Sequence, residues 1–322
     1  MSSTGLNRTL VLEVVRVTEA GAIAASALNG RGNEKAADAA AVEAMRKAFN
    51  DLPIDGRVVI GEGERDEAPM LYIGEEVGAG GVAVDIALDP LEGTTICAKA
   101  MPNALAVVAI SERGGLLNAP DVYMDKIAVG GGLPDGVIDL DKSATENVEA
   151  VAAAKGKNVE EMMICVLDRP RHAKLIKELR GIGCGVALIG DGDIAGVIAT
   201  TDAKTGIDMY MGSGGAPEGV LASAALRCIG GQMEGRLLFR NDDERARAYK
   251  WGIEDLDRKY TMMDMASGDV IFAATGVTDG SMLKGVHRTV EGVTTDTVTM
   301  RSKTKTIRRV ETLHGYDKAE QV

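Results

Sequence analysis

The chain has 322 residues, of which 45% are hydrophobic, so it can bury one large core or two smaller ones. Its formal net charge of −12 argues against nucleic acid as a partner, because a phosphate backbone attracts basic surfaces. No apolar run reaches the roughly 18 residues of a membrane span, and the polar N-terminus lacks a signal-peptide pattern. We therefore expect a cytoplasmic protein with no membrane partner.

Cysteine and histidine spacing limits the kinds of metal site. The sequence has four cysteines and three histidines, widely separated and without a Cys-x-x-Cys pair. Buried, reduced thiols are favoured over a metal or redox role, and a zinc site is not expected. Any metal should be held by oxygen ligands. The cysteines are Cys97, Cys165, Cys184 and Cys228.

The first 60 residues predict two helices and a strand. Apolar residues recur at helical spacing over 10–28 and 34–52, and a strand follows over 57–60. Asp38 falls in the first turns of the second helix, where an acidic residue suits the helix dipole, so the residues alone favour a structural role. Glu62 follows the strand between two glycines that allow a tight bend, and further acids follow it. It is a candidate metal ligand, with a charged surface loop as the alternative.

The stretch from Val82 to Thr95 carries the most specific motif, Asp-Pro-Leu-Glu-Gly-Thr. Alternating apolar residues predict a strand, which Pro90 should end at Asp89. Asp89 and Glu92 then crowd a turn, and hard oxygen ligands at this density indicate Mg²⁺ or Mn²⁺. Thr94 would present a hydroxyl and a backbone N–H beside that cation. A solvated acidic turn is the alternative.

The middle of the chain suggests a change in organisation. A strand is expected over 104–110, and Tyr123 follows a proline turn, where it is either a buried tyrosine or a ligand contact. Ser143 and Glu146 form a capping-box pattern before an alanine-rich helix. We place a sub-domain boundary in 135–142, giving sub-domains of about 1–140 and 141–322 within a single catalytic unit.

Beyond this boundary strands and helices alternate, which argues for a parallel sheet with crossover helices. In such sheets ligands bind at the carboxyl ends of the strands, where three polar clusters fall. Arg169 and Arg171 can bind a phosphate through paired donors. Asp191 and Asp193 can accept from sugar hydroxyls or act as helix caps, and Glu218 lies at a helix start where a solvated glutamate is the alternative. The strands are expected over 163–167, 186–190 and 207–211, and the helices over 171–180, 194–200 and 217–229.

The last hundred residues are less informative. Residues 241–258 predict a charged helix, and 297–310 a basic strand that could hold a second phosphate or touch RNA. A strand with one solvated face is the favoured interpretation, and the acidic chain disfavours RNA further.

Clustered carboxylates, a Gly-Thr turn and an arginine pair fit phosphate-ester hydrolysis. Divalent cations can bind the phosphate and lower the pKa of a water, which the high barrier of this reaction requires. The Thr94 hydroxyl could orient that water; a covalent phosphothreonine is less favoured.

These motifs resemble those of the class II bacterial fructose-1,6-bisphosphatases over almost the whole chain. The Asp-Pro-x-Glu-Gly-Thr element is also similar to that of the wider lithium-sensitive, metal-dependent phosphatase superfamily. Asn33 stands where relatives often carry an acid, and Arg169 where some carry Lys. The other segments that carry the resemblance are 61–74, 118–123, 169–172, 191–193 and 214–219.

The resemblance implies a layered α/β/α/β/α sandwich with a mixed N-terminal sheet and a mainly parallel C-terminal sheet. It also implies hydrolysis of the 1-phosphate of fructose 1,6-bisphosphate to fructose 6-phosphate, with sedoheptulose 1,7-bisphosphate as a further possible substrate. More than one Mg²⁺ or Mn²⁺ ion is expected, with Thr94, Glu62 and Asp89 as catalytic residues. By resemblance the metal ligands are Asp38, Glu62, Asp89, Glu92 and Glu218, which replaces the structural interpretation of Asp38. The implied substrate contacts are Glu92, Gly93, Thr94, Tyr123, Arg169, Pro170, Arg171, Asp191, Gly192, Asp193 and Gly215.

Two other functions remain open. One is an inositol- or nucleotide-phosphate phosphatase built on the same metal core, and the other is a non-catalytic sugar-phosphate sensor. A homo-oligomer, either a dimer or a tetramer, is expected in each case.

Overall fold

The computed structural model describes residues 6–63 and 70–316 and divides into two compact units. Unit 1 comprises 1–114 and 269–322, and unit 2 comprises 115–268. The predicted boundary at 135–142 therefore falls inside unit 2. The chain returns to unit 1 because the strand Val270–Gly276 pairs with Leu105–Glu112, a long-range contact that local sequence patterns do not reveal. The acids expected to follow Glu62 lie in 64–69, outside the described residues.

Unit 1 contains a mixed sheet with the order β12-β13-β11-β4-β3-β1-β2, and β14 pairs with β13. Strands β1 and β3 are parallel, whereas the other pairings are antiparallel. This confirms the mixed N-terminal sheet. The strands are β1 (Ile54–Ile60), β2 (Glu76–Val77), β3 (Val82–Glu92), β4 (Leu105–Glu112), β11 (Val270–Gly276), β12 (His287–Arg288), β13 (Gly292–Arg301) and β14 (Thr306–Gly315).

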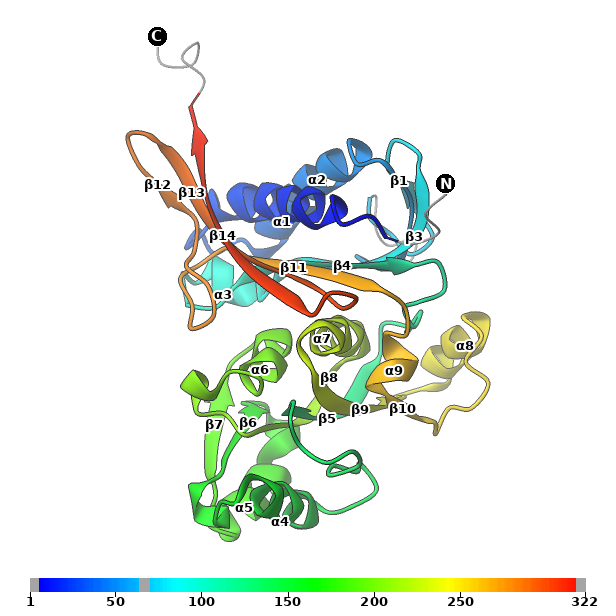
Figure 1. Cartoon of the computed structure of the whole chain (residues 1–322), viewed down its shortest axis with the longest axis vertical. Helices are drawn as coiled ribbons and strands as arrows, with labels where there is room; N and C mark the ends of the chain where they lie inside the picture. The colour runs from blue at the N-terminus through cyan, green and yellow to red at the C-terminus, as the bar shows by residue number, and fades with distance from the viewer. Residues whose placement is uncertain (1–5, 64–69, 317–322) are drawn as a thin grey trace. The chain divides into compact units, whose positions relative to one another are not determined.

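Helices α1 (Leu10–Ser26) and α2 (Glu34–Asn50) lie side by side along one face of this sheet (Figure 1). Residues at helical spacing on α1, such as Leu10, Val14 and Val17, are buried against it, as the periodicity predicts. Asn33 caps α2 by accepting from the Ala36 N–H at 3.0 Å, which gives this position a structural role. A short helix, α3 (Thr94–Ala98), follows β3.

The basic segment 297–310 is a hairpin and not the single strand predicted. β13 and β14 pair antiparallel around a turn that includes Lys305 at φ 50°. Polar residues alternate through both strands and the turn, so the sequence pattern does not mark where the chain reverses.

Unit 2 contains a sheet with the order β10-β9-β5-β8-β6-β7. Only β6 with β7 and β6 with β8 are parallel; the other three pairings are antiparallel. The α/β class is confirmed, but the prediction of a mainly parallel sheet is wrong, because the strand–helix alternation covers β6 to β8 alone. The strands are β5 (Tyr123–Gly130), β6 (Met163–Leu167), β7 (Gly185–Ile189), β8 (Met209–Gly215), β9 (Gly231–Leu238) and β10 (Lys259–Thr261).

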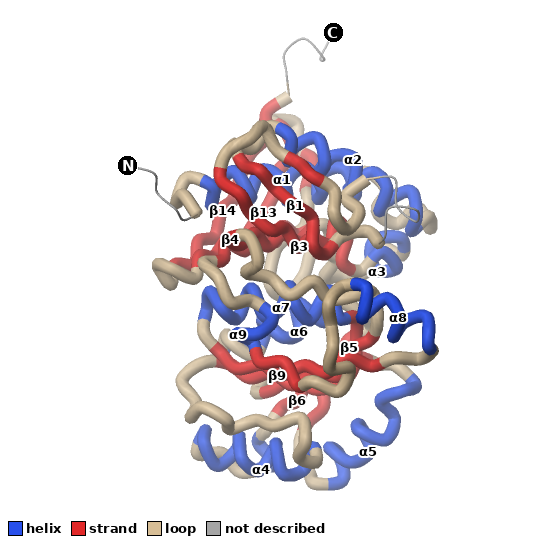
Figure 2. Tube along the Cα trace, turned by 90° about the vertical axis from the view of Figure 1, so that its right-hand side faces the viewer, coloured by secondary structure: helices blue, strands red, loops and turns tan. Residues whose placement is uncertain are grey.

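Helices cover both faces of the unit 2 sheet (Figure 2). α4 (Ala144–Lys155) and α5 (Ala173–Gly181) cover one face, and α6 (Asp193–Ala199) and α7 (Ala216–Ile229) the other. The capping box of Ser143 and Glu146 at the start of α4 is confirmed. The predicted charged helix is shorter than expected, as α8 (Asp242–Lys250), and α9 (Met262–Met265) completes the unit.

All four cysteines are buried and none forms a disulfide, as the prediction of buried, reduced thiols requires. Within the described ranges, no helix combines the length and apolar character that crossing a bilayer requires.

Candidate functional site

Asp38 and Glu62 form a carboxyl pair in unit 1. Asp38 lies on the second turn of α2 and Glu62 directly after β1, and their side chains are hydrogen-bonded to each other. Burial and the neighbouring Asp38 carboxylate raise the pKa of Glu62 to about 8, and burial also raises the pKa of Asp38. Two carboxyl groups this close share a proton unless a cation replaces it. The pair therefore fits a divalent cation better than it fits a solvated surface loop.

The backbone at Glu62 is shaped by a close approach. A Cβ at the preceding Gly61 would overlap the carbonyl oxygen of Leu71, so a side chain cannot be accommodated there. The Glu62 N–H donates to that same carbonyl at 3.1 Å, which holds the turn that presents the carboxyl group.

β3 continues through Pro90 to Glu92, so the predicted strand end at Asp89 is wrong. The ladder with β4 pairs Asp89 with Val107 and Glu92 with Leu105, and its register shifts between them. Such an irregularity tolerates a proline that cannot donate to the ladder. Glu92 is thereby carried into a buried position, with 3% of its surface exposed.

Thr94 begins α3 after Gly93, which adopts φ 87° and ends the strand sharply. Asp89 accepts from the Leu91 N–H at 3.1 Å, which orders the turn. Asp85, on the same strand, binds Arg57 at 2.9 Å and accepts from the Gly114 N–H at 2.6 Å. Those partners account for Asp85 as a structural residue.

In unit 2, Arg171 and Tyr123 form a cation–π contact. The Arg171 guanidinium lies 4.7 Å from the Tyr123 ring centroid, and that of Arg240 lies 5.1 Å from the same ring. Arg171 Nη2 also donates to the Ser213 carbonyl oxygen at 2.7 Å. Tyr123, which is partly buried, helps to orient two cationic side chains at the start of β5.

His172, the residue after Arg171, links the end of β6 to Ser213 through both of its ring nitrogens. Its Nδ1 donates to the Leu167 carbonyl oxygen at 2.7 Å, and its Nε2 accepts from the Ser213 N–H at 2.8 Å. Burial lowers the pKa of His172, so the neutral ring that this pattern requires is favoured. The second predicted phosphate-binding arginine, Arg169, is partly buried, whereas Arg171 is exposed, and its guanidinium lies 3.7 Å from the Asp191 carboxylate.

A buried lysine that the sequence analysis did not select lies among the predicted ligands of unit 2. Lys126, on β5, is 1% exposed, forms an ion pair with Asp193 and donates to the Gly215 carbonyl oxygen at 2.9 Å. Asp193 therefore uses its carboxylate for Lys126 and not for a helix cap. The available signal was the pair of charges at Asp125 and Lys126 inside an otherwise apolar strand.

Glu218 lies in the first turn of α7, beside this cluster. Burial and the Asp193 carboxylate raise its pKa to about 7, against the opposing effect of Lys126. Its Oε2 is buried and has no hydrogen-bond partner among the described residues. A Cβ at Gly215 would overlap this oxygen, so glycine leaves the space that the carboxyl group occupies. A buried carboxylate oxygen without a donor suits a metal ligand.

The predicted metal ligands fall in both units. In the described part of the chain, no group of three or more Asp, Glu, His or Cys side chains has metal-binding geometry. The structure brings Asp38 and Glu62 together and places Asp89 and Glu92 near each other on β3, while Glu218 belongs to unit 2.

Comparison with known proteins gives a consistent result. A family model described as bacterial fructose-1,6-bisphosphatase, glpX-encoded, matches residues 8–314. A Synechococcus elongatus protein named D-fructose 1,6-bisphosphatase class 2/sedoheptulose 1,7-bisphosphatase is 43% identical, across 98% of this chain and 99% of its own. An Escherichia coli protein named fructose-1,6-bisphosphatase 1 class 2 is 46% identical, across 98% of both chains.

Proposed function

Because the chain belongs to the family of glpX-encoded bacterial fructose-1,6-bisphosphatases, we propose that it hydrolyses fructose 1,6-bisphosphate to fructose 6-phosphate and inorganic phosphate. It is then a phosphoric monoester hydrolase of carbohydrate metabolism. The single observation that carries this proposal is the hydrogen-bonded carboxyl pair of Asp38 and Glu62, since a catalyst for phosphate hydrolysis needs concentrated positive charge and this pair favours a cation.

The proposed cofactor is Mg²⁺ or Mn²⁺, held by the carboxylates of Asp38, Glu62, Asp89, Glu92 and Glu218. These ligands are all hard oxygen donors, the class that both cations prefer. When bound, the ions would offset the charge of the phosphate and make a nearby water more acidic.

The protein's own groups would position the substrate and the water. Thr94, at the start of α3, would orient the attacking water through its hydroxyl. Arg171, already fixed by Tyr123 and Ser213, would hold the phosphate that is not cleaved, with Arg169 beside it. Fixing these side chains before the substrate binds lowers the entropy cost of positioning it.

The remaining predicted contacts would bind the sugar and the reacting phosphate. Asp191, Gly192 and Asp193 would accept from or approach the sugar hydroxyls, and the Gly215 backbone would allow close approach. Glu92 and Gly93 would contact the phosphate through the turn that precedes α3.

The direct test is phosphate release from fructose 1,6-bisphosphate by purified protein with Mn²⁺. Release that EDTA abolishes is expected, and no turnover with metal-loaded protein would refute the proposal. Sedoheptulose 1,7-bisphosphate belongs in the same panel, because the Synechococcus elongatus relative carries both substrates in its name.

Thr94→Ala separates an enzyme from a sugar-phosphate sensor. The variant should bind Mn²⁺ and substrate like the wild type but lose at least about 100-fold in kcat, the scale of a lost proton-transfer or orienting group. Thr95→Ala, a neighbouring threonine on α3, is the matched control and should retain most of its kcat. Equal kcat values in the two variants would exclude the role assigned to Thr94.

Arg171→Ala tests the preference for a bisphosphate over inositol or nucleotide monophosphates. Losing a charge-assisted contact of about 1.5–3 kcal/mol should raise KM for the bisphosphate roughly 10- to 100-fold. The KM for a monophosphate should change far less. Arg245→Ala, an exposed arginine paired with Asp242, is the control. A similar rise for both substrates would favour the monophosphate alternative.

Two further properties stay predictions. Cytoplasmic location and assembly into a dimer or tetramer can be checked by cell fractionation and by sedimentation of the purified protein.

A further inference from the structure

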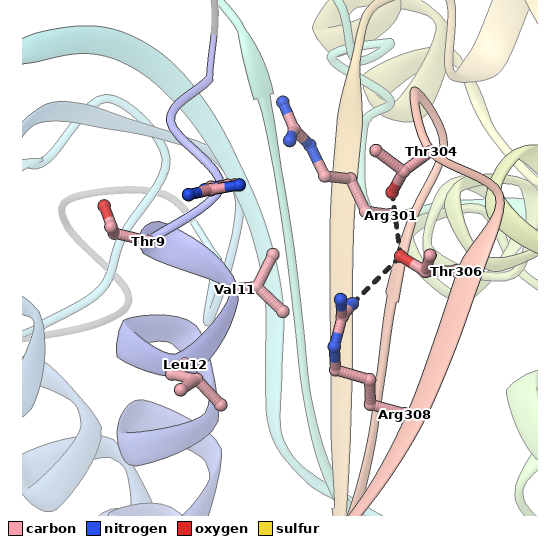
Figure 3. A pocket seen from close by; sticks show the side chains of 8 residues that line it. Thr9, Val11, Leu12, Arg301, Thr304, Thr306 and Arg308 are labelled. Atoms are coloured by element: carbon pink, nitrogen blue, oxygen red, sulfur yellow. Dashed lines mark hydrogen bonds between the residues drawn. The ribbon is translucent and has the colours of Figure 1, made fainter.

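Unit 1 contains a pocket of about 480 Å³ at the start of α1, lined by side chains that the proposed reaction does not use. Arg8 and Thr9 border it from the α1 side, together with two aliphatic side chains of that helix. Arg301 on β13, and Thr304, Thr306 and Arg308 of the β13–β14 hairpin, border it from the other side (Figure 3).

The charged side chains that line this pocket are all positive. Three arginines line it, and none of its described lining residues is acidic, although the chain as a whole carries a net charge of −12. Arg8 and Arg308 form no ion pair with any side chain in the described ranges. Exposed cations gathered without counter-charges repel one another, so an anion placed among them would be stabilised.

Arg301 is the fixed member of the three arginines, and Asp269 already offsets its charge. It is 7% exposed, its Nη2 binds Asp269 at 2.9 Å and the Leu6 carbonyl oxygen at 2.6 Å, and its position is therefore fixed. Its Nε is buried and has no hydrogen-bond partner within 6–63 and 70–316. That N–H has no accessible surface, so the exposed guanidinium groups of Arg8 and Arg308 are the donors that an anion in the pocket would reach.

The other walls suit a phosphate group attached to an apolar moiety. Arg308 Nη1 donates to Thr306 Oγ1 at 2.9 Å, and Thr304 and Thr306 hydroxyls are 2.8 Å apart, so these donors are pre-arranged on one wall (Figure 3). The 17-residue helix α1 begins at the pocket, where its dipole is positive. Val11 and Leu12 add an apolar wall, and Leu12 is 53% exposed.

We propose that this pocket is a second anion site, which binds a small organic phosphate separately from the candidate catalytic residues. The arginines and threonines would bind the phosphate oxygens, and Leu12 would cover the organic part. Because no lining residue belongs to the proposed metal or substrate set, this site does not depend on the proposed function.

The test uses full-length, metal-free protein in EDTA, so that catalysis is absent. Phenylphosphonate is a suitable probe because its P–C bond cannot be hydrolysed by a phosphatase. Titration calorimetry gives the affinity, and hydrogen exchange should show added protection of the start of α1 and of the β13–β14 hairpin. Inorganic phosphate, which lacks the ring, should bind more weakly.

Matched variants identify the site. Arg8→Ala/Arg308→Ala should weaken phenylphosphonate binding at least 10-fold. Arg309→Ala should not, because Arg309 neighbours Arg308 on β14, points to the opposite face and donates to the Met282 carbonyl oxygen instead. Arg171→Ala should also leave this affinity unchanged, which separates the pocket from the candidate phosphate-binding residues of unit 2.

Three results would overturn the proposal. These are equal affinity in the double variant and the wild type, protection at neither segment, or a change of oligomeric state in the double variant alone. The last would mean that a second copy of the chain covers the pocket. Far-UV circular dichroism of each variant checks that the exposed arginines can be removed without unfolding.

Discussion

Glu62 should make the stability of the metal-free protein fall as the pH rises. In the folded protein its proton is retained up to a pH of about 8, whereas the ordinary glutamate pKa is 4.5. Between these values the unfolded chain binds fewer protons than the folded one, so linkage lowers the free energy of unfolding as the pH increases. The stabilising effect is complete below pH 4.5 and is lost by about pH 8.

The size of the effect follows from the same shift. One unit of pKa corresponds to about 1.4 kcal/mol, so the range from 4.5 to about 8 represents about 3–5 kcal/mol for this carboxyl group. Glu62→Gln cannot ionise. Relative to the wild type, metal-free Glu62→Gln should therefore become more stable by a few kcal/mol between pH 5 and pH 9.

Hydrogen exchange of α2 and β1, measured in EDTA from pH 5 to pH 9, reports the opening of unit 1 directly. Comparing variant and wild type at each pH cancels the intrinsic dependence of exchange on pH. Glu43→Gln is the control on α2, because Glu43 is exposed, pairs with Lys47 and has a lowered pKa. The exchange protection of Glu43→Gln should differ little from that of the wild type, and this difference should not grow at high pH.

Manganese provides the complementary measurement. Mn²⁺ should restore protection in the wild type most strongly near pH 8, where it replaces the proton shared by Asp38 and Glu62, and much less in Glu62→Gln. If the protection of metal-free Glu62→Gln differs from that of the wild type by a constant amount from pH 5 to pH 9, the shared-proton interpretation is refuted.

Two further predictions concern unit 2. Gly215→Ala should weaken Mn²⁺ binding about 10- to 100-fold, because the new Cβ displaces the Glu218 carboxylate; Gly181→Ala, with no atom within 4 Å of its Cβ, should bind Mn²⁺ normally. Unchanged Mn²⁺ titration of Gly215→Ala would contradict this. Lys126→Met leaves Asp193 buried and unpaired and should lower the free energy of unfolding of unit 2 by about 3–5 kcal/mol. The double variant Lys126→Met/Asp193→Asn should recover part of this loss. Urea unfolding followed by the fluorescence of Trp251, which belongs to unit 2, measures both. Additive losses in the double variant would show that the pair is not coupled.

Local patterns were sufficient for much of the secondary structure. Apolar periodicity located α1 and α2, the Ser143 capping box located α4, and a short apolar run located β6. Each of these signals depends on residues within a few positions of one another, which is the range over which helix caps and side-chain periodicity act.

Strand partners could not be predicted in the same way. The antiparallel neighbours of β5, the β13–β14 hairpin and the return of β11 to β4 depend on residues far apart in the sequence. The predicted direction of the unit 2 strands and the predicted single strand over 297–310 were wrong at these places, because pairing is decided by burial and long-range hydrogen bonds and not by local propensity.

The sequence by itself determined the family, the α/β class and the identity of the candidate carboxylates, because a long motif specifies residue types and their order. Tertiary structure decided their environment: that Asp38 and Glu62 are hydrogen-bonded to each other, that Glu218 is buried beside Lys126, and that Arg8 lines a pocket with Arg308. Charge state and accessibility depend on which distant segments exclude water from a side chain, and that information exists only once the chain has folded.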